Sequence, residues 1–283
     1  MKPIEKVVTA ADLQMLPPIS PAASKVLKLL DDPKADAVAI QRVIQYDPGL
    51  TANVLKAANS PYFGFRQETL SLRSAVVRLG SRWLHQVVVA SFAKAAMEQD
   101  VPGYDLPAGE LWRHAVGVSV ASDRLVALLG VSVADEIFTA ALLHDIGKIV
   151  LGQKVGSDVQ RIEAATAAGV SFEAAERAVL GLDHAAAGAC LLEAWALPQQ
   201  LVDVVRWHHQ PEDAERQSLV LDIVHLADVV CLMLGIGTGR DGLCYRPSTG
   251  AMKRLQLKVS DLEAVAAETP LGLEELLAGL NAA

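Results

Sequence analysis

The chain has 283 residues, of which 52% are hydrophobic and 20% are charged, and its formal net charge is −8. This composition is typical of a folded protein with one large core or two small ones, and it excludes general disorder. The acidic balance argues against broad electrostatic binding to nucleic acid or to an anionic membrane surface.

Helical patterns dominate the first part of the chain, and strand patterns are almost absent. Short helices are predicted over residues 21–30, 36–46, 49–59, 71–80 and 83–97. Asp36 and Ser71 are candidate N-caps, and Gly80 ends the fourth of these helices. Several short helices in close succession indicate a compact helical subdomain over residues 1–98.

The second part of the chain also has the periodicity of helices. They are predicted over residues 108–129, 133–150, 157–168, 171–179, 184–195, 198–208 and 218–234. A glycine-rich loop, GIGTGRDG, follows them, and Pro270 suits the start of the last helix. The pattern predicts an all-α fold, with a second helical subdomain over residues 99–240 and terminal helices over 241–283 that pack on it.

The three cysteines, Cys190, Cys231 and Cys244, are odd in number and widely spaced. A disulfide framework is therefore not expected, and a cytoplasmic location is expected instead. The N-terminus has no apolar run long enough for a signal peptide. The most tempting membrane candidate, residues 219–237, contains ionisable side chains that a lipid-facing helix tolerates poorly, so no membrane span is expected.

Five of the seven histidines and two aspartates follow one another in the order of a metal-ligand set. These residues are His114, His144, Asp145, His184, His208, His209 and Asp228. Imidazole and carboxylate groups bind divalent zinc, iron, manganese and nickel, and one carboxylate can bridge two ions. Glu110 lies four residues before His114 on the same helix face, so both side chains can reach one site.

Each of these residues has an ordinary structural explanation when it is taken alone, as a hydrogen-bonded core group or as a helix-terminal residue. His225 at most supports a ligand without binding metal itself, and His85 is interpreted as structural. Together, however, seven ionisable side chains on apolar or boundary segments are an expensive arrangement for a core without metal. We therefore expect a buried metal site.

The order His, His-Asp, His, His-His, Asp resembles the ligand set of the HD-domain metal-dependent phosphohydrolases, and of their HD-GYP branch in particular. Glu110 and His114 match the leading Glu-x-x-x-His of that branch, and Lys148 matches the lysine of its HD-x-x-K motif. The segment HHQPEDAERQS has no Gly-Tyr-Pro signature, which is associated with cyclic di-GMP hydrolysis. The chain departs from the branch at this point.

Other parts of the sequence are similar to the HDOD family, the HD-related output domains of bacterial signalling systems. They are LPPISPAASKVLKLL, DPGLTANVLKAANSPYFG, SLRSAVVRLGSRWLHQVVV and GLDHAAAGACLLEAWALPQQLVDVVRWHHQP. The resemblance covers about residues 14–235 and implies an HD-like helical bundle preceded by a smaller N-terminal helical subdomain. Many HDOD members lack the metal ligands, whereas this chain keeps a nearly full set.

The resemblance implies two divalent ions, with iron expected first and manganese, nickel or zinc as the other candidates. Asp145 would bridge the two ions. One ion would be held by His144, Asp228 and either His114 or Glu110, and the other by His184, His208 and His209. Asp145 and Lys148 are the candidate catalytic residues, because a metal-activated water and a nearby cation promote attack on a phosphoryl group.

Three classes of function are consistent with these observations, and whether the chain is an enzyme stays open. The favoured function is that of a regulatory HDOD protein that binds a signalling partner or a phosphorylated small molecule. The alternative is an active metal-dependent phosphohydrolase or phosphodiesterase acting on a nucleotide or cyclic dinucleotide. A haem or redox-sensing di-iron protein uses the same ligand types. The sequence does not indicate an oligomeric state.

Arginines occur at intervals among the short helices predicted in residues 66–95, a pattern that is also found in helix-turn-helix proteins. They are Arg66, Arg73, Arg78 and Arg82. In an acidic chain these side chains are better explained as a solvated helix face. Nucleic acid is therefore not an expected partner.

Overall fold

The structure, a computed structural model, describes residues 20–30, 32, 34–60, 69–131, 136–195, 197–242 and 245–281. Over these residues it consists of α-helices and short 3-10 turns, and it contains one isolated bridge, between Val101 and Leu106, but no β-strand. The predicted all-α fold class is thereby confirmed. No helix in this part of the chain is long and apolar enough to span a membrane. Cys244 lies outside the described residues, and Cys190 and Cys231 are free thiols.

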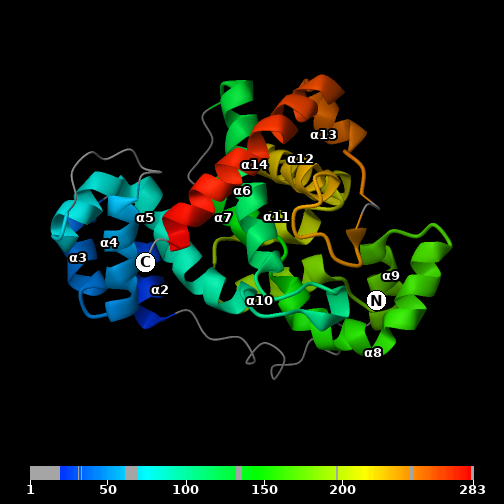
Figure 1. Cartoon of the computed structure of the whole chain (residues 1–283), viewed down its shortest axis with the longest axis horizontal. Helices are drawn as coiled ribbons and strands as arrows, with labels where there is room; N and C mark the ends of the chain where they lie inside the picture. Colours follow the sequence, from blue (N-terminus) through cyan, green and yellow to red (C-terminus); the bar gives the residue numbers. More distant parts are fainter. Residues whose placement is uncertain are drawn as a thin grey trace. The chain divides into compact units, whose positions relative to one another are not determined.

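The described residues form two compact units, one within residues 20–95 and 271–281 and the other within residues 96–270. The first unit contains α2 (Pro21–Leu30), α3 (Ala37–Ile44), α4 (Pro48–Asn59) and most of α5 (Leu72–Met97), all in blue to cyan in Figure 1. The expected cap of α3 is present, because the Asp36 carboxylate accepts a hydrogen bond from the Ala39 amide at 2.7 Å. The break expected at Gly80 is a kink inside α5, where this glycine has a φ of 67°.

The second unit is a helical bundle in which α6 (Glu110–Leu129) and α12 (Leu219–Met233) are largely buried and pack against each other. Its other helices are α7 (Glu136–Leu143), α8 (Gly147–Ala167), α9 (Phe172–Leu180), α10 (His184–Ala194), α11 (Gln199–Trp207), α13 (Thr249–Arg254) and the first half of α14 (Val259–Asn281). Helix α6 packs against α7 and α12, whereas α10 packs against α8 and α11 (Figure 1). Because α12 is apolar nearly all round, almost every one of its side chains is buried.

The helix predicted over residues 133–150 is wrong in one important respect. Helix α7 ends at Leu143 and α8 begins at Gly147, so the chain turns at His144 and Asp145. Helix α8 then runs on to Ala167 with a kink at Asp158 (φ −112°, ψ 15°), so the helix predicted separately over residues 157–168 corresponds to the part of α8 that follows this kink. The turn is tight, with the Ile146 amide donating to the Leu143 carbonyl at 3.1 Å.

Gly147, the first residue of α8, lies directly against α10. A β-carbon on this residue would lie 1.9 Å from the His184 carbonyl oxygen and 2.4 Å from the Gly188 amide. Only glycine therefore lets α8 approach the backbone of α10 so closely. At the other end of the unit, the expectation that Pro270 starts a helix is also wrong, because α14 continues through this residue.

Candidate metal centre

Two of the candidate ligands are held in the same way, each at the residue that follows the end of a helix. His144 follows α7, and its Nδ1 lies 2.6 Å from the carbonyl oxygen of Ala141. His208 follows α11, and its Nδ1 lies 2.7 Å from the carbonyl oxygen of Val205. A carbonyl oxygen only accepts hydrogen bonds, so Nδ1 donates in both rings and Nε2 is the nitrogen that is available to a ligand.

The rings of His114 and His184 are also oriented through Nδ1. Nδ1 of His114, on α6, donates to the Ile236 carbonyl at 2.8 Å. Nδ1 of His184, at the start of α10, donates instead to the carboxylate of Glu176 at 2.7 Å, and the same oxygen accepts the His184 amide at 3.0 Å. Tyr104 donates its hydroxyl hydrogen to the other oxygen of Glu176. His184 is therefore the one of these four histidines whose orienting partner carries a charge.

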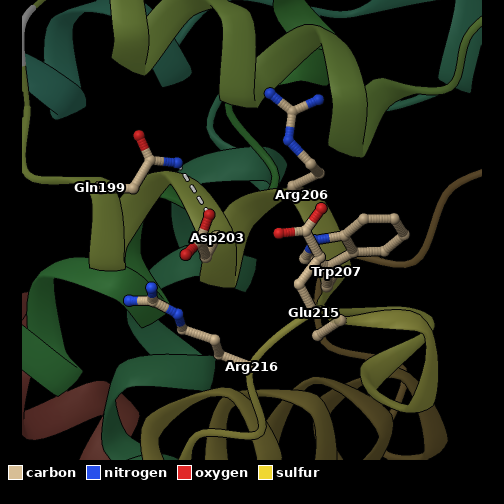
Figure 2. A pocket seen from close by; sticks show the side chains of 7 residues that line it. Gln199, Asp203, Arg206, Trp207, Glu215 and Arg216 are labelled. Atoms are coloured by element: carbon tan, nitrogen blue, oxygen red, sulfur yellow. Dashed lines mark hydrogen bonds between the residues drawn. The ribbon is translucent and has the colours of Figure 1, made fainter.

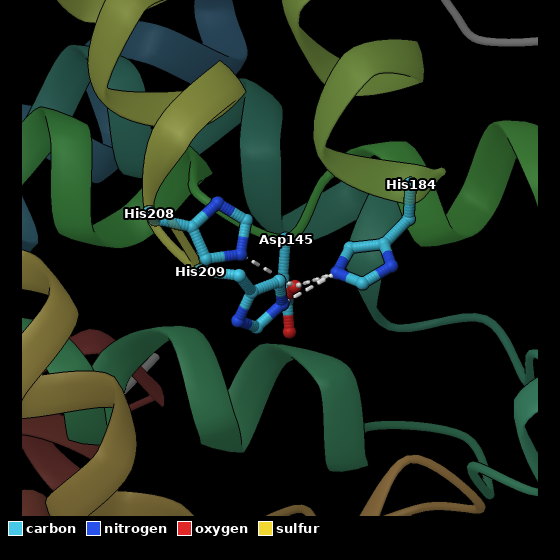
Figure 3. A group of neighbouring side chains, drawn as sticks. All are labelled: Asp145, His184, His208 and His209. Atoms are coloured by element: carbon cyan, nitrogen blue, oxygen red, sulfur yellow. Dashed lines mark hydrogen bonds and ion pairs between the residues drawn. The ribbon is translucent and has the colours of Figure 1, made fainter. Parts of the chain in front are cut away.

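Asp145 lies at the centre of the cluster, and its two oxygens face different side chains. Oδ1 lies 3.4 Å from Nε2 of His184 and 3.6 Å from Nε2 of His208. Oδ2 lies 3.5 Å and 3.6 Å from Nε2 of His144 and His114, and 2.6 Å from the Lys148 ammonium. Figure 3 shows Asp145 between the rings of His184, His208 and His209. This arrangement is the one expected of a carboxylate that bridges two ions.

Among the described residues, three overlapping groups have ligand atoms that all lie within 4.8 Å of one another. They are Asp145, His184, His208 and His209; then His114, His144 and Asp145; and then His144, His208 and Asp228. The second and third groups are continuous, because Oδ1 of Asp228 lies 3.1 Å from Nε2 of His114 and 3.7 Å from Nε2 of His144. The structure therefore brings seven of the eight sequence-predicted ligands together.

Three ligand atoms in this cluster are buried and have no hydrogen-bond partner. They are Oδ1 of Asp145, Nε2 of His208 and Oδ2 of Asp228. An unpaired buried carboxylate oxygen or imidazole nitrogen costs free energy, so native structures rarely keep one without a partner. Imidazole nitrogen and carboxylate oxygen are the donors that divalent transition metals prefer, and the residues therefore fit such ions.

The protein alone balances the charge of this cluster by protonating some of its histidines. Burial opposes the charged form of His144, but the carboxylate of Asp145 outweighs burial and raises the pKa of His144 to about 10. In the same way, Glu176 outweighs burial at His184 and raises its pKa to about 9. Burial lowers the pKa values of His208 and His209, so these two rings are neutral.

The pKa values of both aspartates lie well below the usual value. Burial opposes the charged form of each carboxylate, but Lys148 outweighs it at Asp145, and the neighbouring rings of His114 and His144 outweigh it at Asp228. Both carboxylates are therefore charged and able to bind a cation.

Glu110 is the predicted ligand that belongs to none of the three groups found in the described part of the chain. It is partly exposed at the first residue of α6, one turn before the buried His114. His225 has the supporting place expected of it. Its Nδ1 donates to the His208 carbonyl at 2.7 Å and its Nε2 accepts from the Ser248 amide at 2.9 Å, so the backbone occupies both ring nitrogens.

Three residues next to the ligands were missed in the sequence, of which Glu176 and Asp241 are buried and Tyr245 is partly buried. Glu176 orients His184, Asp241 pairs with Lys148, and the ring of Tyr245 stacks on His209 with centroids 4.3 Å apart and an angle of 7°. Burial raises the pKa of Tyr245 well above its usual value, so its hydroxyl stays protonated. An acidic residue eight positions before a ligand histidine is a usable signal for Glu176, whereas Asp241 and Tyr245 have none, because only the fold brings them here.

A surface pocket in the same unit lies apart from this cluster and contains none of its ligands. It has a volume of about 360 Å³ and includes Asp203 and Arg206 on α11 (Figure 2). Asp203 accepts a hydrogen bond from Gln199 at 2.8 Å, and Arg206 pairs with Glu193 at 2.8 Å. Two acidic side chains, Asp203 and Glu215, and two basic ones, Arg206 and Arg216, line the pocket, so its lining has no net charge that favours an anion or a cation.

Comparisons with known proteins agree with this description. In Treponema pallidum, an uncharacterized protein is 22% identical over 223 residues, which are 77% of this chain and 42% of that protein, so the chain spans less than half of this relative. An HDOD domain protein of unknown function from Geobacter sulfurreducens has the same fold, with a TM-score of 0.74, 22% identity and 98% of each chain covered.

Two further solved structures resemble the chain. A candidate phosphohydrolase from Shewanella amazonensis is 25% identical, with a TM-score of 0.69 and with 94% of this chain and 95% of that one covered. A candidate signal transduction protein from Marinobacter aquaeolei is 20% identical, with a TM-score of 0.74 and with 95% of this chain and 59% of that one covered. A family model for the HDOD domain matches residues 16–211, and the chain belongs to the HDOD family.

Proposed function

We propose that this protein is a signal-transduction module whose helical bundle binds a pair of divalent transition-metal ions. The observation that carries the proposal is the set of buried, unpaired ligand atoms on Asp145, His208 and Asp228. The three atoms come from three different segments and lie in one buried cluster, where bound cations would give each of them a partner.

The ligands divide into two sets that share Asp145. His184, His208 and His209 form one set, and His114, His144 and Asp228 form the other. Iron is the first candidate for these ions, and manganese, nickel and zinc bind the same donor types. Bound ions of this kind would supply Lewis acidity and lower the pKa of a coordinated water molecule.

A regulatory role is favoured because the ligands are closed off from solvent. The side chains of His144, His184 and Asp145 are at most 1% exposed, and that of His209 is 5% exposed. Metal sites that only stabilise a fold are closed in this way, whereas catalytic sites keep an open position for water or substrate. On this proposal the ions stabilise the bundle, and the bundle in its metal-bound form binds a signalling protein or a phosphorylated small molecule.

Metal-dependent phosphoester hydrolysis is the second candidate, and Lys148 is the observation that favours it. Its ammonium lies 2.6 Å from Asp145, so it can neutralise charge on a phosphoryl group held beside the bridging carboxylate. The charged partners Asp145 and Asp241 raise the pKa of Lys148 despite burial, and its cationic form is therefore maintained.

Elemental analysis of purified and metal-reconstituted protein tests the metal site. We expect close to two ions per chain in the wild type and a large loss in Asp145→Asn. Asp222→Asn is the matched control, because Asp222 is a buried carboxylate on α12 that pairs with Arg254 at 2.6 Å and touches no ligand. Metal-free wild type after reconstitution, or full occupancy in Asp145→Asn, would contradict the proposal.

Turnover separates the two roles. The metal-loaded protein is incubated with cyclic dinucleotides and with a chromogenic phosphodiester, and Asp145→Asn serves as the inactive variant. Hydrolysis that is lost in this variant supports the enzyme. Full metal occupancy without hydrolysis rejects the enzyme and leaves the regulatory module.

A further inference from the structure

The glycine-rich segment that follows α12, residues 235–242, lies directly against the candidate metal centre. Its Ile236 carbonyl accepts the hydrogen bond from His114, and its Arg240 amide donates to the Tyr104 carbonyl at 2.8 Å. Two of its glycines are required by this close approach. A β-carbon on Gly237 would lie 2.6 Å from the β-carbon of His114, and one on Gly239 would lie 2.2 Å from the Tyr104 carbonyl oxygen.

Asp241, near the end of this segment, inserts a third carboxylate beside the two candidate ligand aspartates. Its Oδ2 forms an ion pair with the ammonium of Lys148, and both side chains are at most 2% exposed. Lys148 therefore has two carboxylate partners, Asp145 and Asp241. Asp241 is absent from all three ligand groups in the described residues, and its Oδ1 is buried without a hydrogen-bond partner.

The position of Asp241 conflicts with the role that Lys148 would have toward a phosphorylated ligand. A lysine binds phosphate as a point charge, and its ammonium has few directions from which an anion can approach. Here Asp145 takes one direction and Asp241 takes another. A phosphoryl oxygen at this ammonium would also meet the negative charge of Asp241 in a buried environment, where like charges repel strongly.

We propose that the carboxylate of Asp241 occupies the anion position of Lys148 and competes there with phosphorylated ligands. Asp241 is then an internal competitor that holds the site in a low-affinity state, and displacement of the 235–242 segment is the event that admits an anion. This inference rests on the proposed function only in assigning an anionic ligand to Lys148. Neither the geometry of Asp241 nor its test depends on catalysis.

The test measures binding of inorganic phosphate by calorimetry at constant ionic strength in the wild type and in Asp241→Asn. The asparagine keeps the size of the side chain and a hydrogen-bond acceptor for Lys148, but it removes the charge. We expect phosphate to bind at least about tenfold more tightly to Asp241→Asn, since a hydrogen bond between charged groups contributes that much or more. The double variant Asp241→Asn/Lys148→Gln should lose this gain.

Glu263→Gln is the matched control, because it removes one negative charge from an exposed position on α14. An equal gain in this control would show a general effect of net charge and would overturn the proposal. So would a phosphate affinity of Asp241→Asn that equals or falls below that of the wild type, including no detectable binding by either. Loss of metal from Asp241→Asn would show that this residue is a ligand, and it would also refute competition.

Repeating the comparison on metal-free protein separates this proposal from the metal site itself. Lys148 and Asp241 are present in both forms, so the gain in Asp241→Asn should persist without metal. If the wild type binds no metal but the gain is seen, the metal proposal fails and the Asp241 proposal stands. If metal binds as expected and no gain is seen, only the Asp241 proposal fails.

Discussion

Metal binding should release about two protons per chain at pH 7.5. Metal takes the lone pair of an imidazole nitrogen, so a protonated histidine must lose its proton before it can bind. His144, with a pKa of about 10, and His184, with a pKa of about 9, are both charged at this pH. His208 and His209 have lowered pKa values, are already neutral and contribute no protons.

The size of the effect follows from these two values. At pH 7.5 a group with a pKa of about 9 is about 97% protonated and one with a pKa of about 10 almost fully, which gives about 2.0 protons in total. At pH 9 the sum falls to about 1.4, because His184 is then half deprotonated. The apparent metal affinity should accordingly rise by about a hundredfold per pH unit near neutrality and less steeply above pH 9.

Calorimetric titration with zinc or manganese, in buffers of different ionisation enthalpy, counts the released protons. Glu176→Gln should lower the count at pH 7.5 by about one, since Glu176 maintains the charged form of His184. Glu173→Gln is the control, because Glu173 is a buried carboxylate on the same helix, and its hydrogen bonds come from Ser171 and Gln210 rather than from a ligand ring. Release of fewer than about one proton by the wild type would refute the charge state described for the metal-free centre.

Two further predictions concern the stability of the fold. Because the pKa values of His144 and His184 are raised, their contribution to the stability of metal-free protein is complete below pH 6.5 and falls progressively until it is lost at about pH 9 for His184 and about pH 10 for His144. Thermal unfolding from pH 6.5 to 10 should therefore show a falling midpoint, and a flat profile would contradict this. Gly147→Ala should lower the free energy of unfolding, measured with denaturant, by about 3 kcal/mol. The control is Gly156→Ala on the same helix, where the nearest atom to an added β-carbon would be 3.7 Å away, so this change should be neutral or slightly stabilising. Equal effects of the two substitutions would refute the close approach of α8 to α10.

Much of the helical fold could be predicted from the sequence, because apolar periodicity and capping residues are local signals. The end of α7 could not, since the segment from Thr139 to Leu151 has apolar residues throughout and no proline, and Gly147 is its sole irregular position. At this break Gly147 lies directly against the backbone of α10, and such a tertiary contact leaves no local signal in the sequence. The continuation of α14 through Pro270 was missed because a proline favours a helix start, and here tertiary packing outweighs that preference.

The candidate site also has a part that could be predicted from the sequence and a part that could not. Histidines and aspartates on apolar segments could be read from the chain, and the structure brings seven of the predicted ligands together, although their binding of metal stays a prediction. Residue Asp241 could not be identified, because it reaches Lys148 across 93 positions of sequence and lies in a glycine-rich loop with no periodic pattern. Its role depends on which loop covers the cluster, and only the folded chain determines that.

The way in which the histidines are oriented has a consequence for mutational scanning. Three of the four orienting partners are main-chain carbonyls, those of Ala141, Val205 and Ile236. A side-chain replacement at these positions leaves the carbonyl in place, so a scan would find no supporting residue for three rings that are held as firmly as the fourth. Among the four orienting partners, only Glu176 would be identified by such a scan, because its side chain makes the hydrogen bond to His184. A ligand set supported in this way tolerates sequence drift around it, and its conservation would be confined to the ligands themselves.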